Sequence, residues 1–396
     1  MWSKMLSEKR IVLGVSGGIA SYKSVEISRR LVDAGAFVSP IMTSAAKKFI
    51  GEVTLSALAS EPVKSSLWDE DDPIPHTTLG QQADLILVAP ATAKLIGTYA
   101  AGISSDLLSA TLLATRAPVI LCPAMHTEMW EHPAVQENIN TLKSRGVVIV
   151  DPEDGILAGG DLGKGRLAGV EAILSEVEST LTKKDLSNLR LLITAGGTRE
   201  PIDPVRYITN KSSGKQGYAL AKAAHLRGAE VTLVTTMPDD APFGVEVLCA
   251  ETASDMRNVV MGIQSEYDVI IMAAAIADFR PAEISEQKIK KRKGSTNLKL
   301  ENTHDFLIDL GKGKRPEQTI VGFAAETEHL EENALEKLER KHLDLIVANN
   351  VSHPGVGFSY DTNEVTIMSQ DSKWTLPLSD KRIIADGILD ALLEVR

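Results

Sequence analysis

One pattern occurs twice in this chain and limits its fold more than any other feature. It consists of an apolar strand, a turn or loop rich in small residues, an amphipathic helix and a second strand. The first copy comprises residues 11–15, the turn Ser16-Gly17-Gly18, residues 19–33 and residues 37–42. The second copy comprises residues 191–195, a long loop, and residues 217–227 and 230–236. Strands that alternate with amphipathic helices form parallel sheets covered by helices on both faces. We therefore predict two doubly wound α/β domains.

The rest of the chain continues this alternation. Further strands are predicted at residues 84–89, 119–122, 147–150, 268–274, 320–323 and 344–348. The polar segment 180–188 follows a predicted helix at 170–181 and places the boundary near Asp185. The predicted domains are therefore residues 1–185 and 186–396, each large enough to bury its own core. The chain ends with a predicted hairpin, residues 364–368 and 374–378, and a helix at 380–395.

Composition excludes several classes of protein. The net charge is 42 − 53 = −11, which argues against a nucleic-acid scaffold because binding to phosphate backbones needs surplus cation. Two cysteines, Cys122 and Cys249, make neither a disulfide framework nor a C-x-x-C zinc site. His126 and His132 have a spacing that does not stack two ligands on one helix face, so no metal is assigned to them. No apolar run has the length of a membrane span, and we expect a soluble, cytoplasmic protein.

The turns that follow the first strands indicate phosphate-containing ligands. In doubly wound sheets, ligands bind at the carboxyl ends of the strands, where glycines let backbone amides approach a phosphate. The long loop of the second copy contains Ala195-Gly196-Gly197-Thr198 and Ser212-Ser213-Gly214-Lys215. Neither copy has the G-x-G-x-x-G spacing, and the second strand of the first copy ends in Ile41-Met42-Thr43 without an acidic residue. Both features disfavour an NAD dehydrogenase.

The second half resembles bacterial phosphopantothenate–cysteine ligases. The resemblance covers nearly all of residues 189–396 and rests on blocks in the family's order: residues 191–217, AAAIADFRP at 273–281, KIKK at 288–291, VGFAAET at 321–327 and KHLDLIVANNV at 341–351. It implies a Rossmann-like domain that makes an acyl-cytidylate from CTP and 4′-phosphopantothenate, releasing pyrophosphate. The amine of cysteine then displaces CMP. Mg²⁺ is implied by the triphosphate, although no metal ligand is assigned.

The family's residues can be placed on this sequence one by one. Asn210 matches the residue that holds the acyl-cytidylate, and Lys288 matches the lysine needed when cysteine attacks. Asp278 matches the acceptor of the cytosine amino group, a pairing also seen between carboxylates and cytosine in DNA. The remaining expected substrate contacts are Gly196, Gly197, Ser212, Gly214, Ala275, Ile276, Phe323 and Lys341.

Three of these features also have a plain structural interpretation. The lysine-rich segment from residue 288 to 300 is often simply a solvated edge, although a lysine flap flexible around Gly294-Ser295 fits the other blocks better. Asn210 on its own would suit an Asx turn. Asp278 on its own would suit a helix N-cap.

The first half resembles FMN-dependent cysteine decarboxylases of the flavodoxin-like fold. The resemblance covers about residues 7–173. It rests on GVSGGIASYK at 14–23, MTSA at 42–45, His76 in DPIPHTTLG, APATA at 89–93, GISSDLLS at 102–109, PAMHTEMW at 123–130 and GDLGKGRL at 160–167. It implies FMN contacts at Ser16, Gly17, Gly18, Thr43, Ser44, Pro90, Ala91, Thr92 and Ser105. It implies substrate contacts at Met125, Gly160, Asp161 and Arg166, the last three in a clamp over the substrate.

The chemistry explains why a flavin is required. Direct loss of CO₂ from a cysteine carboxylate would leave an unstabilised carbanion, whereas prior oxidation of the side chain to a thioaldehyde provides an electron acceptor. His76 matches the family's active-site histidine and suits proton transfer, because an imidazole titrates near neutral pH.

Three positions depart from the decarboxylase pattern. Lys94 and His126 replace asparagines, and Gly159 replaces the clamp cysteine that is credited with protonating the product. Either His126 has taken over as the acid, or Cys122 supplies a thiol, or the half is a flavin-binding scaffold without turnover.

The two resemblances together imply a bifunctional enzyme of coenzyme A biosynthesis that forms 4′-phosphopantothenoylcysteine and decarboxylates it to 4′-phosphopantetheine. The alternatives are an active ligase with a non-catalytic first domain, or a flavin-binding regulatory protein. The expected partners are the small-molecule substrates 4′-phosphopantothenate, L-cysteine and CTP, with no nucleic acid and no membrane. By analogy with the family, we expect a homo-oligomer with a trimeric first domain and a dimeric ligase domain.

Overall fold

The chain forms two compact units, Met1–Thr182 and Lys183–Arg396. The computed structural model describes residues 6–68, 72–290, 297–352, 355–357 and 360–396. Residues 183–187 belong to the second unit, because their side chains form hydrogen bonds and ion pairs with residues of that unit. Lys184 Nζ donates to Leu226 O at 2.7 Å, and the buried Arg227 forms ion pairs with Asp185 and Asp390, both at 2.8 Å. None of the described helices is long and apolar enough to cross a membrane.

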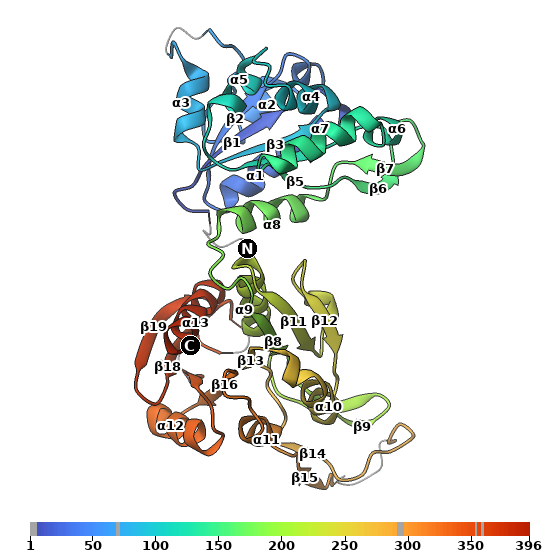
Figure 1. The fold of residues 1–396 in the computed structure, drawn as a ribbon. Helices are drawn as coiled ribbons and strands as arrows, with labels where there is room; N and C mark the ends of the chain where they lie inside the picture. The colour runs from blue at the N-terminus through green and yellow to red at the C-terminus, as the bar shows by residue number, and fades with distance from the viewer. Residues whose placement is uncertain (1–5, 69–71, 291–296, 353–354, 358–359) are drawn as a thin grey trace. The chain divides into compact units, whose positions relative to one another are not determined.

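The first unit is built on a five-stranded sheet in the order β2-β1-β3-β4-β5, with every pair parallel. This is the flavodoxin-like order of a doubly wound sheet, as predicted. Its strands, with the outlying hairpin β6–β7, are β1 (Arg10–Val15), β2 (Phe37–Met42), β3 (Leu85–Ala91), β4 (Val119–Pro123), β5 (Val148–Ile149), β6 (Glu153–Ile156) and β7 (Leu162–Arg166). Its helices are α1 (Lys23–Asp33), α2 (Glu52–Ser56), α3 (Pro75–Gln82), α4 (Ala93–Ala100), α5 (Leu107–Ala114), α6 (Thr127–Trp130), α7 (Pro133–Ser144) and α8 (Val170–Leu181) (Figure 1).

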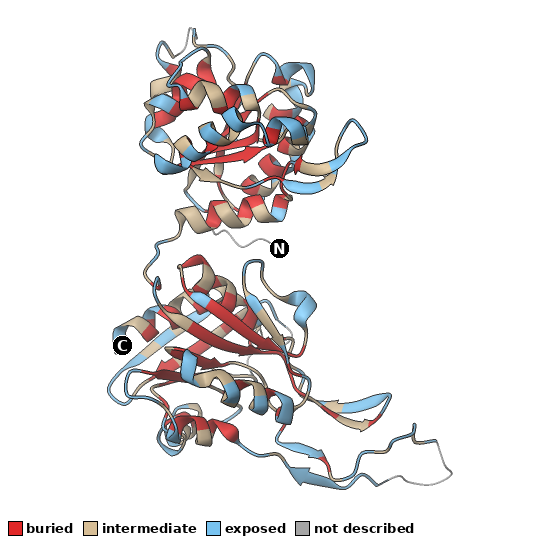
Figure 2. Ribbon diagram, turned by 45° about the vertical axis from the view of Figure 1, so that its right-hand side comes forward, coloured by how far each residue is buried: buried red, intermediate tan, exposed pale blue. Residues whose placement is uncertain are grey.

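Apolar side chains cover both faces of this sheet. Ile27 and Leu31 of α1 pack with Ile173 and Val177 of α8 in one cluster, and α3, α4, α5 and α7 supply the other. Figure 2 shows the central strands buried between these layers. The predicted helix over residues 19–33 begins as a short 3₁₀ turn at Ile19–Tyr22 and becomes α-helical only at Lys23.

The second unit contains an eight-stranded sheet in the order β12-β11-β8-β13-β16-β17-β18-β19. The first six strands are parallel and have the Rossmann order 3-2-1-4-5-6, whereas β18 and β19 are antiparallel. The sheet strands are β8 (Arg190–Ala195), β11 (Glu230–Thr235), β12 (Glu246–Cys249), β13 (Val269–Met272), β16 (Thr319–Glu326), β17 (Leu345–Asn350), β18 (Thr362–Met368) and β19 (Lys373–Asp380). The helices are α9 (Lys215–Leu226), α10 (Ala253–Ile263), α11 (Phe306–Lys312), α12 (Leu330–Arg340) and α13 (Lys381–Val395). This Rossmann-like sheet was also predicted.

Two ribbons outside this sheet were missed by the sequence analysis. The segment expected to be a loop contains the antiparallel hairpin β9 (Arg199–Asp203) and β10 (Arg206–Thr209). A second ribbon pairs β14 (Phe279–Pro281) with β15 (Leu300–Asn302). Asp203 stabilises the first hairpin, since its carboxylate accepts from Val205 N and Arg206 N, both at 2.9 Å. Its ion pair with Arg206 holds the pKa of the Asp203 carboxyl well below the usual range.

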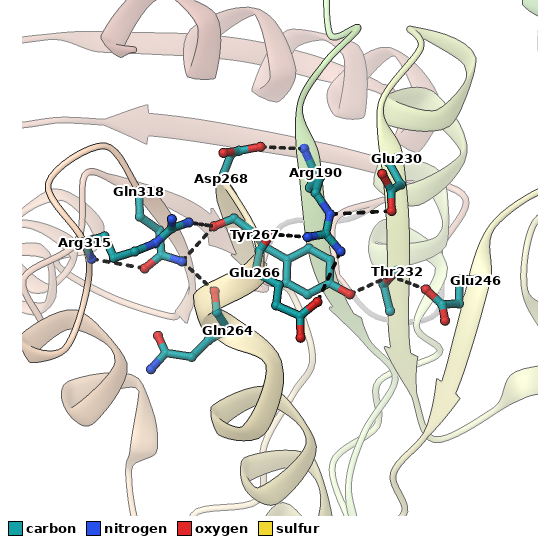
Figure 3. Close-up of polar contacts among 10 residues, drawn as sticks. All are labelled: Arg190, Glu230, Thr232, Glu246, Gln264, Glu266, Tyr267, Asp268, Arg315 and Gln318. Atoms are coloured by element: carbon teal, nitrogen blue, oxygen red, sulfur yellow. Dashed lines mark hydrogen bonds and ion pairs between the residues drawn. The ribbon is translucent and has the colours of Figure 1, made fainter.

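A polar network ties together the amino ends of the parallel strands (Figure 3). The Asp268 carboxylate, just before β13, accepts from Arg190 N at 2.8 Å, and the Arg190 guanidinium lies 5.1 Å from the Tyr267 ring centroid. The buried Tyr267 hydroxyl donates to Thr232 Oγ1 at 2.8 Å. Gln318, which is also buried, donates through Nε2 to Gln264 O and Tyr267 O at 2.8 and 2.9 Å. This network fixes β8, β11, β13 and β16 at the edge opposite the expected ligand sites.

We expect Gln318→Leu to lower the free energy of unfolding of the second unit by about 1–2 kcal/mol, because buried hydrogen bonds are lost and Leu cannot replace them. Urea unfolding followed by hydrogen exchange of peptides from β13 and β16 measures the change. The matched control is Gln287→Leu at an exposed position, which should leave the urea midpoint in place. Equal midpoints for the two variants would contradict the role given to this network.

Two candidate ligand sites

The first cavity opens at the carboxyl ends of β1, β3 and β4 and has a volume of about 620 Å³, within the range of small-molecule sites. Its wall brings together segments that are far apart in the sequence. Of the predicted contacts, it contains Ser16, Gly17, Gly18, Thr43, Ser44, Thr92, Ser105, Met125, His126 and Arg166.

The turn after β1 is held closely against its neighbours. Ser16 Oγ donates to Pro90 O at 2.8 Å and accepts from Thr92 N at 2.9 Å. A Cβ on Gly17 would lie 2.3 Å from Ala45 Cβ, so only glycine fits there. Gly18 starts the 3₁₀ turn, and its N–H donates to Ser21 Oγ at 3.3 Å. The next two amides, of Ile19 and Ala20, have no hydrogen-bond acceptor among the described residues and are therefore available to an anion.

Cationic side chains add to this anion-binding character. Lys23, Lys94 and Arg166 all line the first cavity. Lys23 Nζ donates to Leu167 O at 3.2 Å. Burial and the nearby Arg166 guanidinium lower the pKa of the Lys23 amine, although the carboxylates of Glu153 and Glu26 oppose the shift. The cavity thus combines a glycine turn with positive charge at the place where a phosphate was expected.

The hairpin β6–β7 lies against the segment 125–127, and three glycines make this contact possible. Met125 N donates to Gly165 O at 3.0 Å, and a Cβ on Gly165 would lie 2.1 Å from Met125 O. A Cβ on Gly163 would lie 2.3 Å from Thr127 Oγ1. A Cβ on Gly159, between the two strands, would lie 2.9 Å from His126 Cε1 and 3.0 Å from Asp161 Oδ2. The His126 ring therefore occupies space that a side chain at position 159 would need.

Other predicted contacts of the first site do not line this cavity. Pro90 and Ala91 are buried beneath its floor, where Pro90 O orients Ser16. Gly160 and Asp161 lie at the tip of the β6–β7 hairpin, outside the wall. His76 lies on α3, a helix that Figure 1 shows at the opposite end of the first unit from the β6–β7 hairpin. Its Nδ1 is buried without a hydrogen-bond partner among the described residues.

Cys122 is not a candidate acid for the first cavity. Its thiol is fully buried in the core and does not line the cavity. Burial raises the pKa of this thiol far above its usual range. This alternative from the sequence analysis was therefore wrong, because a core strand position is sealed from the ligand edge.

The second cavity opens at the carboxyl ends of β13, β16 and β17 beside the start of α9, and has a volume of about 320 Å³. It brings together the predicted residues Asn210, Ser212, Gly214, Ala275, Ile276, Asp278, Phe323 and Lys341. Asn210 Nδ2 donates to Ala275 O at 3.3 Å and to Ile276 O at 3.1 Å. Both hydrogens of this amide are thus engaged with backbone before any ligand binds.

Three predicted residues of the second site do not line this cavity. Gly196 and Gly197 instead allow loop 209–214 to approach the strand end, since a Cβ on Gly197 would lie 3.1 Å from Asn210 O. Gly196 has a φ of +89°, which favours glycine. Lys288 is exposed and lies off the wall. The predicted hinge of its segment, Gly294-Ser295, lies outside the described residues.

Three cations of the second cavity were not predicted as site residues from the sequence, namely Lys215, Lys337 and Lys381. Lys337 Nζ pairs with Glu326 Oε1 at 2.5 Å, and the predicted Lys341 pairs with Asp305 at 2.8 Å. Lys337 precedes Lys341 by one helical turn, and this spacing is a signal that could have identified it. No pattern in the sequence pointed to Lys381.

Comparisons with known proteins match a family model to each of the two units. The model of the family described as DNA/pantothenate metabolism flavoprotein C-terminal domain matches residues 186–395, and the Flavoprotein family model matches residues 2–182. The coenzyme A biosynthesis bifunctional protein CoaBC of Bacillus subtilis is 45% identical, over 98% of this chain and 97% of that protein. Its namesake in Mycobacterium tuberculosis H37Rv is 44% identical, over 97% and 96%. A crystal structure of the C-terminal domain of CoaBC is 40% identical, with a TM-score of 0.45, over 53% of this chain and 96% of that one.

We expect Gly165→Ala to detach the β6–β7 hairpin from segment 125–127, because the new methyl group would overlap a backbone carbonyl that cannot move independently of its chain. Amide hydrogen exchange in residues 153–166 should speed up at least tenfold, measured by mass spectrometry. The matched control is Gly155→Ala in the same hairpin, where the nearest neighbour is the adaptable Arg166 side chain, at 3.2 Å. If both variants exchange at the wild-type rate, the hairpin is held in another way.

Proposed function

This chain belongs to the family of bifunctional coenzyme A biosynthesis proteins, and we propose that its second unit joins 4′-phosphopantothenate to L-cysteine and its first unit decarboxylates the product. One observation supports assigning these activities to particular residues. Motifs that are scattered along the sequence meet in two cavities, each at the carboxyl edge of its own parallel sheet.

The residues of the first cavity fit FMN as the flavin. A Cβ on Gly18 would have only Thr92 Cγ2 within 4 Å, at 3.7 Å, so a phosphate can approach this backbone closely. Ile19 and Met129 line the cavity with largely exposed apolar side chains that suit a planar ring. Residues proposed to hold FMN are Ser16, Gly17, Gly18, Thr43, Ser44, Thr92 and Ser105. Bound FMN would supply the redox chemistry that makes loss of CO₂ from a cysteine carboxylate possible.

The other residues of the first cavity would bind the substrate and handle its protons. Lys23 and Arg166 would attract an anionic substrate, and the β6–β7 hairpin, with Gly160 and Asp161 at its tip, would cover it. We assign the final protonation to His126, whose ring stands beside Gly159 and whose Nδ1 lies 3.9 Å from Glu128 Oε2. An imidazole is a suitable acid near neutral pH.

A second copy of the chain would complete the first site. His76 does not line the cavity of its own chain, and its buried Nδ1 lacks a partner among the described residues. In the trimer expected from the family, the first cavity of one protomer would receive His76 from its neighbour. The dimeric arrangement of the ligase unit is likewise a proposal from family resemblance.

In the second cavity, Asp278 would read the cytosine of CTP while Ser212 and Gly214 hold phosphate groups. Lys341 would add positive charge, and Phe323 an apolar wall. Asn210 would exchange one of its two backbone hydrogen bonds for a bond to the acyl-cytidylate. Lys288 would reach the site when cysteine attacks. Among the described residues no cluster of three metal-ligating side chains exists, so Mg²⁺ would be held largely by phosphate oxygens and water.

Product analysis by mass spectrometry tests the proposal. The flavin content of the purified chain is first checked by absorbance. The protein is then given 4′-phosphopantothenate, cysteine, CTP and Mg²⁺, and we expect pyrophosphate, CMP and 4′-phosphopantetheine. Accumulation of 4′-phosphopantothenoylcysteine would instead indicate an active ligase with a non-catalytic first unit. If neither product forms, the proposal fails for both units.

We expect His126→Ala to lower formation of 4′-phosphopantetheine by about 10²-fold or more, the usual contribution of a general acid. A substrate-derived enethiol should accumulate while CO₂ is still released. Gly159→Ala should cause a similar loss, since its methyl group displaces the His126 ring.

The double variant distinguishes this role from simple misfolding. If the Gly159 substitution acts through His126, it should add little once His126 is Ala, so that the two losses are far from additive. Fully additive losses, or a normal product from His126→Ala, would exclude His126 as the acid. The ligase reaction of the same variants provides the internal control.

A further inference from the structure

Lys381 is a buried lysine in the second cavity that the proposed function does not yet use. It is the first residue of α13, and only 6% of its surface is exposed to solvent. It lines the cavity together with Asn210 and Lys215. Its Nζ donates to Gly357 O at 3.0 Å and to Tyr360 O at 2.6 Å. A neutral amine has two N–H groups, so these two carbonyls satisfy it completely and leave its lone pair as an acceptor.

The charges around Lys381 disfavour its protonated form. Among the described residues no carboxylate forms an ion pair with it, whereas Lys337 and Lys341 across the same cavity are paired with Glu326 and Asp305. Burial and then the Lys215 ammonium on α9 lower the pKa of Lys381 to about 8. The positive end of its own 15-residue helix acts in the same direction.

The Asp361 carboxylate opposes this shift only weakly, because it already has a partner. Asp361 raises the pKa of Lys381, yet its Oδ1 is bound by Lys215 Nζ at 2.6 Å. Asp380 caps α13 by accepting from Arg382 N at 2.9 Å. The amine of Lys381 is thus accessible in its neutral form near physiological pH, unlike the paired lysines of the cavity.

The backbone around Lys381 is fixed by amide side chains. Gln216 Nε2 donates to Lys381 O at 3.2 Å, and Gln216 Oε1 accepts from Asn363 Nδ2 at 3.4 Å. Asn349 Nδ2 donates to Asn363 Oδ1 at 3.3 Å. Lys381 N itself donates to Asp361 O at 3.0 Å. The amine is therefore presented to the cavity from a fixed position at the starts of α9 and α13.

We propose that Lys381 Nζ is the general base that accepts the proton from the cysteine amine when this amine attacks the activated acyl group. The proposal rests on the ligase activity proposed above. The cysteine nitrogen forms the C–N bond, the C–O bond to the cytidylate phosphate breaks, and CMP leaves with that electron pair. The proton released from nitrogen passes to Lys381 Nζ and then to solvent. No external oxidant or reductant is needed.

The test separates the two half-reactions in the full-length protein. Pyrophosphate release from CTP and 4′-phosphopantothenate is measured without cysteine, and amide formation is measured after cysteine is added. Lys381→Met should leave pyrophosphate release and the KM for CTP within about threefold of wild type, while amide formation falls by about 10²-fold or more. Hydroxylamine, a nucleophile that is unprotonated at neutral pH, should still trap the acyl group of this variant as a hydroxamate.

Lys381→Arg is the decisive second variant, because a guanidinium can donate to the two carbonyls but cannot accept a proton. It should lose amide formation as Lys381→Met does. In the wild type, amide formation should fall as the pH drops below about 8, because the base becomes protonated. Both variants should keep only the pH dependence of the cysteine amine itself, which also loses its nucleophilic form near this pH. Lys312→Met, on the exposed end of α11, is the matched control and should match wild type throughout.

Other outcomes would overturn the proposal. Normal amide formation by Lys381→Arg would mean that the residue only anchors the loop. Loss of pyrophosphate release, or a large rise in the KM for CTP, would indicate that Lys381 binds an anionic group of the substrate instead. If the wild type itself gives neither pyrophosphate nor hydroxamate, the proposed ligase activity fails, and this inference fails with it.

Discussion

The structure depends on close approach of backbone segments at the carboxyl ends of two parallel sheets. The turn or helix that follows a strand lies so close to neighbouring backbone at these ends that a side chain would not fit between them. Gly17 against Ala45 in the first unit and Gly217 against Ala195 in the second are two examples, with a Cβ placed 2.3 and 2.6 Å from the nearest atom. Because backbone comes this close, amide groups rather than side chains can face a ligand phosphate.

Charge is distributed differently in the two cavities. In the first, Lys23, Lys94 and Arg166 lie around an apolar wall, which suits a ligand with one anionic end and one planar end. In the second, Lys215, Lys337 and Lys341 are each paired with a carboxylate, which reduces the repulsion among these cations. Lys381 is the exception, and burial rather than pairing determines its protonation.

Two of the three departures from the decarboxylase pattern are physically coupled. His126 and Gly159 are far apart in the sequence, yet the ring of one fills the volume that a side chain of the other would occupy. Neither substitution can therefore be interpreted alone. A family resemblance reveals that both positions are unusual, whereas the hairpin β6–β7 reveals that they are neighbours.

The sequence by itself determined both folds, since strand and helix periodicity and the glycine turns specify local structure. Most of the site residues that it predicted also line one of the two cavities, because strand ends in parallel sheets converge on one edge. It did not determine the β9–β10 ribbon, which Asp203 and backbone pairing create. The tertiary structure alone revealed that Cys122 is sealed in the core, that His76 stands away from its own cavity, and that Lys381 is buried without a carboxylate partner among the described residues. Burial and the approach of distant segments depend on packing, and no local pattern encodes them.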